Sequence, residues 1–331
     1  MMDLASIKYK MTNDDVMVII DPSLKYCRNY YNPGKDTILS DKYSDATWNI
    51  FKEIIIDDEL IWDDCEDEAM RRIYHKCRLV SKSFFVDRQS ISQPYFVNAA
   101  QEVLAAILYQ SVWCNIDSSV DDKNALLTNK KLSEMFDLWD TNDFCRFLST
   151  NNMLTNIAKL ISTPARDFEG NLIVDENHEL VYTCDNQEQG GVFQEVVVAV
   201  KDVINNVWAQ SGDFSIRKFV RDRGAKTLFL DVPHSSNIHH LFVDLILHEN
   251  DSQTLPRGEI FLVVPNERLL NSRHFSYLND ISNLCYSGSL QFIAGCDTKD
   301  SFYFRKLNES ASIRKPNESA SIGICPPDCI W

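Results

Sequence analysis

Four short apolar segments constrain the fold of this 331-residue chain more than any other feature. They are rich in Val, Ile, Leu and Phe, and they lie at residues 16–20, 227–232, 260–264 and 290–294. Strands that are apolar on both faces are typical of a parallel sheet covered by helices on each side. We therefore predict an α/β domain that is built on one parallel sheet flanked by helices.

Apolar residues at helical spacing separate these predicted strands, at 46–56, 95–113, 192–208, 238–247 and 275–285. Between about residues 57 and 190 no core strand is predicted, and helical spacing recurs at 126–136, 143–148 and 153–161. A hairpin or loop at 168–182, with Gly170 and Asn171 as its turn, interrupts this region. The pattern indicates an all-helical insertion within the sheet domain.

The chain is accordingly divided into four parts. The sheet domain comprises residues 1–56 and 191–306, and the mostly helical inserted domain comprises residues 57–190. The last part, 307–331, contains the polar sequence Asn-Glu-Ser-Ala-Ser-Ile twice. Such a repeat cannot form an apolar core, so this tail is predicted to be disordered.

The net charge excludes a protein that coats nucleic acid through bulk charge. The 33 Lys and Arg residues against 48 Asp and Glu residues give −15, whereas phosphate neutralisation needs clustered cations. One local basic cluster exists on a short predicted helix that Ser215 could cap, and it consists of Arg217, Lys218, Arg221 and Arg223. Contact with DNA or phosphate and plain solvation of these side chains remain equally open.

An acidic run stands at the start of the insertion, with eight Asp and Glu residues between positions 57 and 68. Charge runs of this kind are usually solvated faces, and the alternative is a site for a basic partner. The chain has no apolar run long enough to span a membrane and no secretory signal, which predicts a cytoplasmic protein. Among ten cysteines only Cys325 and Cys329 form a close pair. A zinc site needs four ligands, so no metal site is predicted there.

Polar residues follow the predicted strands. Asp21 follows the first, the pair Asn266–Glu267 follows the third, and Asp297 follows the fourth. Ligands of open parallel sheets bind in the crevice at the carboxyl ends of the strands. An apolar strand with an acid pair after it is typical of a Walker B element, in which one carboxylate holds Mg²⁺ and the next polarises water. Here Glu267 keeps the base position, but Asn266 is neutral and weakens any metal site. A helix cap is the other interpretation of this pair.

A phosphate-binding loop is missing from the sequence. The motif Gly-x-x-x-x-Gly-Lys-Ser/Thr, whose backbone N–H groups cradle phosphates, does not occur. The nearest fragment, Gly34-Lys35-Asp36, has Asn29 in place of the first glycine and an aspartate in place of the hydroxyl, and we interpret it as a turn. A nucleotide site within these residues is therefore expected to be incomplete.

Several blocks in a fixed order resemble the TraD-like type IV secretion coupling proteins, over most of residues 14–300. The blocks are Val-Met-Val-Ile-Ile-Asp-Pro-Ser at 16–23, the segments 29–39 and 47–53, the helix 93–107, Phe-Ser-Ile-Arg-Lys-Phe-Val at 214–220 with Thr-Leu-Phe-Leu-Asp at 227–231, and Ile-Phe-Leu-Val-Val-Pro-Asn-Glu-Arg at 260–268. The resemblance implies a RecA-like P-loop NTPase core with an inserted all-helical domain. It also implies a DNA-translocating motor of conjugation that binds ATP and Mg²⁺ and forms a hexameric ring.

The chain departs from the family's sequence pattern in features that bear on activity. The Walker A motif would precede the first residue, Asn266 occupies the Walker B aspartate position, and Asp297 stands where the family typically has glutamine. The family's membrane segments, which precede the motor and would hold it at the cytoplasmic face of the inner membrane, are also not found. We expect a fragment that does not hydrolyse ATP alone, binds neither ATP nor Mg²⁺ alone, and retains contacts with DNA or with type IV secretion and relaxosome proteins.

Two other functions are compatible with the residues. An acidic interaction protein would bind a basic partner through the helical insertion. A metal-dependent nuclease would use the acids at the strand ends, but no carboxylates stand at a spacing that such chemistry recognisably requires.

Overall fold

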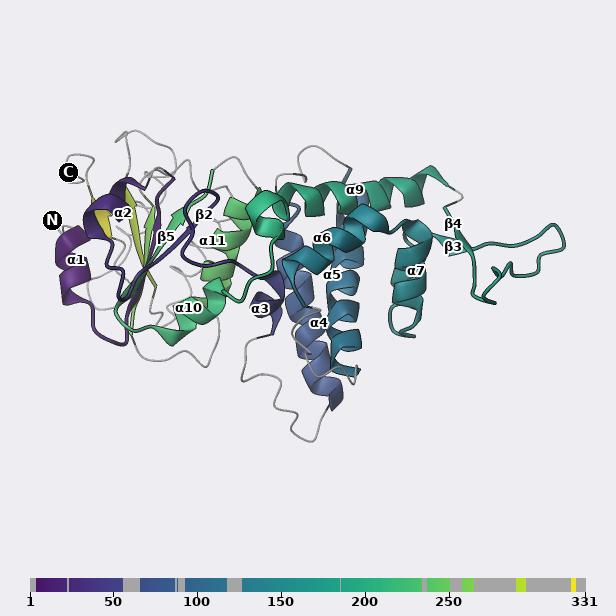
Figure 1. The fold of residues 1–331 in the computed structure, drawn as a ribbon, viewed down its shortest axis with the longest axis horizontal. Coiled ribbons are helices and arrows are strands. Elements are labelled where there is room, and N and C mark those ends of the chain that lie inside the picture. The colour runs from purple at the N-terminus through teal and green to yellow at the C-terminus, as the bar shows by residue number, and fades with distance from the viewer. Residues whose placement is uncertain are drawn as a thin grey trace, which may run out of the picture. The chain divides into compact units, whose positions relative to one another are not determined.

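The computed structural model describes the residues 4–22, 24–55, 66–86, 88, 93–117, 127–184, 186–233, 237–250, 258–264, 290–295 and 323–325. The chain forms two compact units (Figure 1). The sheet unit contains Met1–Trp48 and Phe214–Trp331, and the helical unit is Asn49–Asp213.

The sheet unit is built on one parallel sheet with the strand order β2-β5-β1-β6-β7-β8. The strands are β1 (Val16–Ile20), β2 (Thr37–Ser40), β5 (Lys226–Asp231), β6 (Ile260–Val264), β7 (Leu290–Gly295) and β8 (Gly323–Cys325). All four strands predicted from apolar runs are present, and β1 is fully buried between β5 and β6. The predicted fold class, a parallel sheet flanked by helices, is confirmed.

Two edge strands differ from the prediction. β2 is only four residues long and has polar residues at both ends, so its sequence carries no strand pattern. β8 lies within the tail that was predicted to be disordered. Its backbone pairs with β7, and edge pairing of this kind needs backbone groups rather than an apolar core. The two Asn-Glu-Ser-Ala-Ser-Ile repeats lie outside the described residues.

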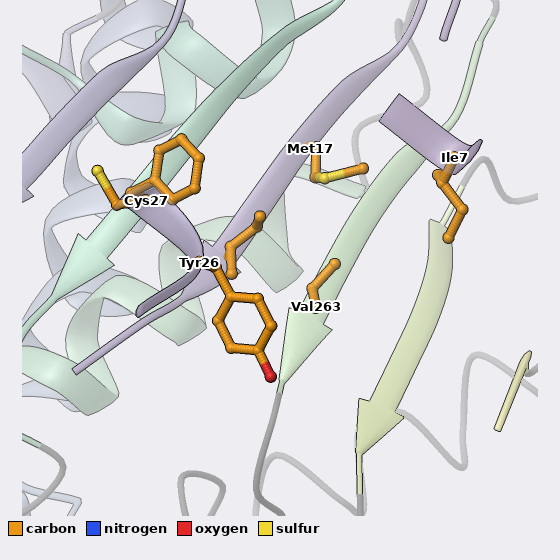
Figure 2. Packing of buried hydrophobic residues seen from close by; sticks show 7 residues of the cluster. Ile7, Met17, Tyr26, Cys27 and Val263 are labelled. Carbon is orange, nitrogen blue, oxygen red and sulfur yellow. The ribbon is translucent and has the colours of Figure 1, made fainter. Parts of the chain in front are cut away.

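One face of the sheet packs against α1 (Leu4–Lys10) and α2 (Lys25–Tyr30). Figure 2 shows the cluster that joins them, with Ile7 from α1, Tyr26 and Cys27 from α2, and Met17 and Val263 from the strands. Alternate residues of β1 point to the same face, and the register sets Phe229 and Val263 on either side of Ile19. Neither helix was predicted, because segments of six or seven residues are too short for a clear helical period.

The helices α10 (Ile216–Asp222) and α11 (Asn237–Asn250) lie on the other side of the sheet from α1 and α2 (Figure 1). The predicted cap of α10 is confirmed, since the Ser215 hydroxyl accepts a hydrogen bond from the Lys218 N–H at 3.0 Å. Trp48 is the last residue of the first chain segment of the sheet unit. Its ring packs edge to face against the ring of Phe242 on α11, with the ring centroids 5.1 Å apart.

The helical unit is arranged around α5 (Pro94–Asp117), whose apolar residues occur all round the helix and are buried accordingly. The other helices are α3 (Ile50–Ile54), α4 (Glu66–Ser83), α6 (Asn129–Leu138), α7 (Thr141–Ser149), α8 (Thr155–Ala158), α9 (Gln187–Val203) and the 3₁₀ helix η3 (Asn206–Ala209). α4 was not predicted, because its mixed charges obscure the apolar stripe.

The boundaries of the helical unit, at residues 48/49 and 213/214, differ from the predicted limits of 57 and 190. α9 accounts for most of the difference, because it packs against α5 and α6 of the helical unit. Phe193 of α9, for example, lies 5.6 Å from Phe144 of α7 between ring centroids. Helical spacing identifies an apolar face, but it does not say which partner buries that face.

A small extended element, residues 163–183, projects from the helices of the helical unit (Figure 1). We call it the arm. It begins with β3 (Thr163–Pro164) and ends with β4 (Tyr182–Thr183), which pair antiparallel. The predicted turn is present, with Gly170 at φ +87°. Most of the acidic run at 57–68 lies outside the described residues.

Candidate functional site at the strand ends

Three described strands bring polar groups together at the carboxyl edge of the sheet. Asp21 directly follows β1, Ser40 ends β2, and Asp231 ends β5. The Asp21 N–H donates to the Leu230 carbonyl at 2.8 Å, which continues the β1–β5 pairing to this edge. The Ser40 hydroxyl donates to the Asp231 carboxylate at 2.8 Å. Sequence analysis identified Asp21 but missed Ser40 and Asp231, although Asp231 ends an apolar strand just as Asp21 does.

The Asp21 carboxylate is used by the protein itself. Its two oxygens accept hydrogen bonds from the N–H groups of Lys25 at 2.9 Å and Cys27 at 2.8 Å. These are backbone donors of the first turn of α2, which a side-chain carboxylate commonly satisfies. The residue before α2, Leu24, has φ +53°, a left-handed conformation that the Asp21 bonds help to hold. Asp21 therefore starts α2.

Burial dominates the electrostatics of this carboxyl. Asp21 is 1% exposed, and this desolvation raises its pKa above the ordinary value of 3.8. The backbone hydrogen bonds from α2 lower the pKa, and the negative charge of Asp231 raises it further. The net direction is upward, because burial outweighs the hydrogen bonds.

The remaining predicted residues of this edge are Asn266, Glu267 and Asp297, and they lie outside the described residues. β6 ends at Val264 and β7 ends at Gly295, in each case two positions earlier. Both strands run parallel to β1, so the chain leaves them at the same edge of the sheet as Asp21.

The described groups at this edge do not fit a Mg²⁺–nucleotide complex. Both oxygens of Asp21 are occupied by the backbone of α2, and the Asp231 carboxylate is bonded to Ser40. Among the described residues no group of three or more His, Cys, Asp or Glu side chains could hold a metal ion.

The predicted basic cluster is divided by the structure. Arg217, Lys218 and Arg221 are partly exposed on α10, while Arg223 is 2% exposed and follows the helix with φ +54°. The predicted apolar side of α10 is confirmed, since Ile216, Phe219 and Val220 are buried. Arg223 could not be distinguished from the others by sequence, because its burial results from the turn that leads into β5.

Lys226 is a basic residue near α10 that sequence analysis did not include. Its ammonium group lies 4.2 Å from the centroid of the Phe219 ring. Burial lowers its pKa, with an opposing contribution from Asp222. An aromatic ring stabilises a cation at this distance. Lys226 thus covers the apolar side of α10 rather than adding to its exposed charge.

In the described part of the chain, none of the helices combines the length and apolar character that crossing a bilayer requires.

No protein-family model and no curated protein matches the chain. Solved structures do match it, and among them are two of the bacterial conjugative coupling protein TrwBdeltaN70. The alignment with the unbound monoclinic form has a TM-score of 0.57 and 14% sequence identity, and it covers 90% of this chain and 60% of the TrwBdeltaN70 chain. The alignment with the trigonal form in complex with sulphate has a TM-score of 0.56 and 15% sequence identity, and it covers 90% of this chain and 61% of the TrwBdeltaN70 chain. This chain thus spans about three-fifths of the length of those structures. The likeness supports a RecA-like fold with a helical insertion.

Proposed function

We propose that this chain is a motor-domain portion of a type IV secretion coupling protein, a protein that moves DNA during conjugation. The observation that supports this most strongly is the arrangement of the fold. A parallel sheet is interrupted after β2 by a helical unit of 165 residues, Asn49–Asp213, and resumes with β5. The fold is similar to that of a conjugative coupling protein over 90% of the chain, at a TM-score of 0.57.

In this proposal the chain supplies the sheet and the DNA contact, and it does not hold nucleotide by itself. The 331 residues contain no phosphate-binding loop. The described carboxylates at the strand ends are used for internal hydrogen bonds. A hexameric ring, as in the family, would bring further residues to this edge from outside the chain.

The proposed DNA contact is the partly exposed basic side of α10, which carries Arg217, Lys218 and Arg221. A chain of net charge −15 repels DNA at long range, so only a local cluster of this kind can bind phosphates. The buried Arg223 is not part of the proposed contact.

Fluorescence anisotropy with labelled single-stranded and double-stranded DNA tests this contact. The variant carries Arg217→Gln, Lys218→Gln and Arg221→Gln. A matched control carries Lys130→Gln, Lys131→Gln and Lys159→Gln, three exposed lysines of the helical unit with the same change in charge. We expect the α10 variant to bind DNA roughly tenfold more weakly than the unaltered chain. The slope of log K for DNA binding against log salt concentration should also become shallower by about three units. Equal effects of variant and control would refute the contact.

Calorimetry with ATP and Mg²⁺ tests the nucleotide part of the proposal. We expect no binding in the micromolar range by this chain. Micromolar binding that Glu267→Ala weakens would mean that the chain has a working nucleotide site, and the proposed division of roles would be wrong.

A further inference from the structure

The arm contains an eight-residue structural repeat. Its three extended segments, 163–167, 171–175 and 179–183, are joined by a closed ring of backbone hydrogen bonds. The Ala165 N–H donates to the Val181 carbonyl at 2.8 Å, Ile173 donates to Ala165 at 3.0 Å, and Val181 donates to Ile173 at 3.0 Å. Each of the three segments therefore contacts both of the others, which makes the arm a defined element and not a loose loop.

The two turns of the arm are built alike. Asp167 and Asp175 start them, and in each turn one carboxylate oxygen accepts the N–H groups two and four positions later, at 2.8–3.1 Å. The residue three positions after each aspartate, Gly170 or His178, has positive φ. The pKa of Asp167 is lowered chiefly by the Asn171 side chain, and that of Asp175 chiefly by the Glu179 N–H. Both turns thus carry ionised carboxylates at neutral pH.

The helical unit holds the arm at its second turn. Arg146 of α7 bonds Asp175 at 2.6 Å, Glu179 at 3.1 Å and the Leu180 carbonyl at 3.1 Å. Asn142, also on α7, accepts the Tyr182 N–H at 2.8 Å. These contacts involve the second turn of the arm, whereas residues 166–174, which include the first turn, are exposed.

The arm leaves several of its apolar side chains exposed. Phe168 in the first turn is fully exposed, and Leu172 and Val174 are about half exposed at 46% and 50%. Leu172 and Val174 are two positions apart on one segment and so share a face. Several large apolar side chains that are exposed together on one small element are typical of an interaction site.

The charge of the arm identifies the kind of partner. One arginine against five carboxylates gives a net charge of −4 for residues 163–183, with histidine neutral. Arg146 pairs with Asp175 and Glu179, and its one positive charge added to −4 leaves a net charge of −3 for the arm and Arg146 together. This charge repels phosphate, whereas it attracts Lys and Arg side chains. We propose that the arm docks on a basic, partly apolar surface of a partner protein.

A defined peptide probe tests this. The probe is a short peptide of alternating lysine and leucine, and its counterpart replaces lysine by glutamate. The arm variant is Phe168→Ser with Leu172→Ser and Val174→Ser, which leaves the backbone bonds and turn aspartates in place. The matched control is Leu138→Ser with Met153→Ser, exposed apolar residues of the same unit outside the arm. Binding is measured by anisotropy, and the site is mapped by amide hydrogen exchange.

We expect the lysine peptide to bind the unaltered chain and to slow amide exchange within 163–183. Binding should fall at least tenfold in the arm variant and stay within twofold in the control, and the glutamate peptide should not bind. The proposal is overturned if variant and control bind the lysine peptide equally, or if the protected amides lie elsewhere. It is also overturned if sedimentation shows a dimer of the unaltered chain that the arm variant abolishes. Unchanged DNA affinity of the arm variant separates this test from that of α10.

Discussion

The side chain of Asn49 donates a hydrogen bond to the carbonyl oxygen of Gly212 at 2.8 Å. Asn49 is the first residue of the helical unit and Gly212 is the last but one, so this bond joins the two ends of the unit. The same amide nitrogen donates to the Leu127 carbonyl, and the side-chain oxygen caps α3 at the Phe51 N–H. The side chain of Asn129 makes a similar pair of hydrogen bonds, since it accepts one from the Ile50 N–H and donates one to the Trp208 carbonyl. Both asparagines are buried, and they close the unit at the point where the chain enters and leaves it.

Replacing Asn49 by alanine should destabilise the chain by about 2–4 kcal/mol, because a buried and a partly buried carbonyl group lose their donor and α3 loses its cap. Urea unfolding followed by circular dichroism measures the change. Asn152→Ala, at an exposed turn of the same unit, should stay within about 0.5 kcal/mol. Similar losses in the two variants would contradict the role of Asn49.

Asp36 should be more important for stability than its cationic partner Lys8. The buried Asp36 carboxylate pairs with Lys8 and also accepts the Asn32 N–H at 2.7 Å and the Thr227 N–H at 2.9 Å. We expect Asp36→Ala to cost about 3–5 kcal/mol, the range for breaking a buried ion pair. Lys8→Met should cost clearly less, because the two backbone donors remain bonded. Equal costs in urea unfolding would mean that the ion pair alone matters.

The raised pKa of Asp21 makes a signed prediction about pH. A carboxyl group whose pKa is higher in the folded chain adds stability at low pH and loses that contribution as the pH rises through the folded pKa. The free energy of unfolding of the unaltered chain, relative to Asp21→Asn, should therefore increase when the pH is lowered from 7 toward 3.8. Asp213→Asn, at an exposed position, is the control for general charge effects. A relative stability of Asp21 that falls on acidification would show that its pKa is lowered, not raised.

Thiol labelling should separate the described cysteines by burial. Burial raises the pKa of Cys145 to about 12 and raises that of buried Cys77 as well, whereas Cys114 and Cys184 are exposed. Alkylation requires both a thiolate and access to it. Iodoacetamide at pH 8 should label Cys114 and Cys184 in the native chain, and all four in urea, as mapped by peptide mass spectrometry. Native labelling of Cys77 at the rate of Cys184 would contradict the packing of α4.

Two glycines with positive φ should respond differently to alanine. Gly258 has φ +124°, and a Cβ there would lie 1.8 Å from the Asp14 carbonyl oxygen, whereas Gly170 has φ +87° and open space around it. Gly170→Ala should cost about 1–2 kcal/mol for the left-handed backbone. Gly258→Ala should cost roughly 3 kcal/mol or more, because the backbone near Asp14 must also move. Comparable costs in urea unfolding would show that this close approach is absent.

Sequence reasoning worked where the local pattern and the tertiary environment require the same residues. β1, β5, β6 and β7 were predictable because a strand at the centre of a parallel sheet is apolar on both faces. α5 was predictable because apolar residues recur along the whole of 95–113. β2 and α2 were not, because each is short and is held by neighbours: β2 by β5, and α2 by the carboxylate of Asp21.

The candidate site, too, was predictable from the sequence only in part. The position of Asp21 after an apolar strand placed it at the edge of the sheet, but its role in starting α2 depends on the path of the chain through Leu24. The basic cluster of α10 was visible in the sequence, yet the burial of Arg223 was not. The two turns of the arm have matching aspartates in the sequence, but only the folded arm joins Ala165, Ile173 and Val181 in one ring.

By itself the sequence determined the α/β class, the existence of a helical insertion and the polar character of the strand ends, since these depend on which side chains avoid water over a few consecutive residues. The tertiary structure alone decided where the insertion begins and ends, which carboxylates are used internally and which apolar side chains stay exposed. Those outcomes depend on hydrogen bonds and packing between residues far apart in the chain, such as Asn49 with Gly212, and no local pattern encodes such pairs.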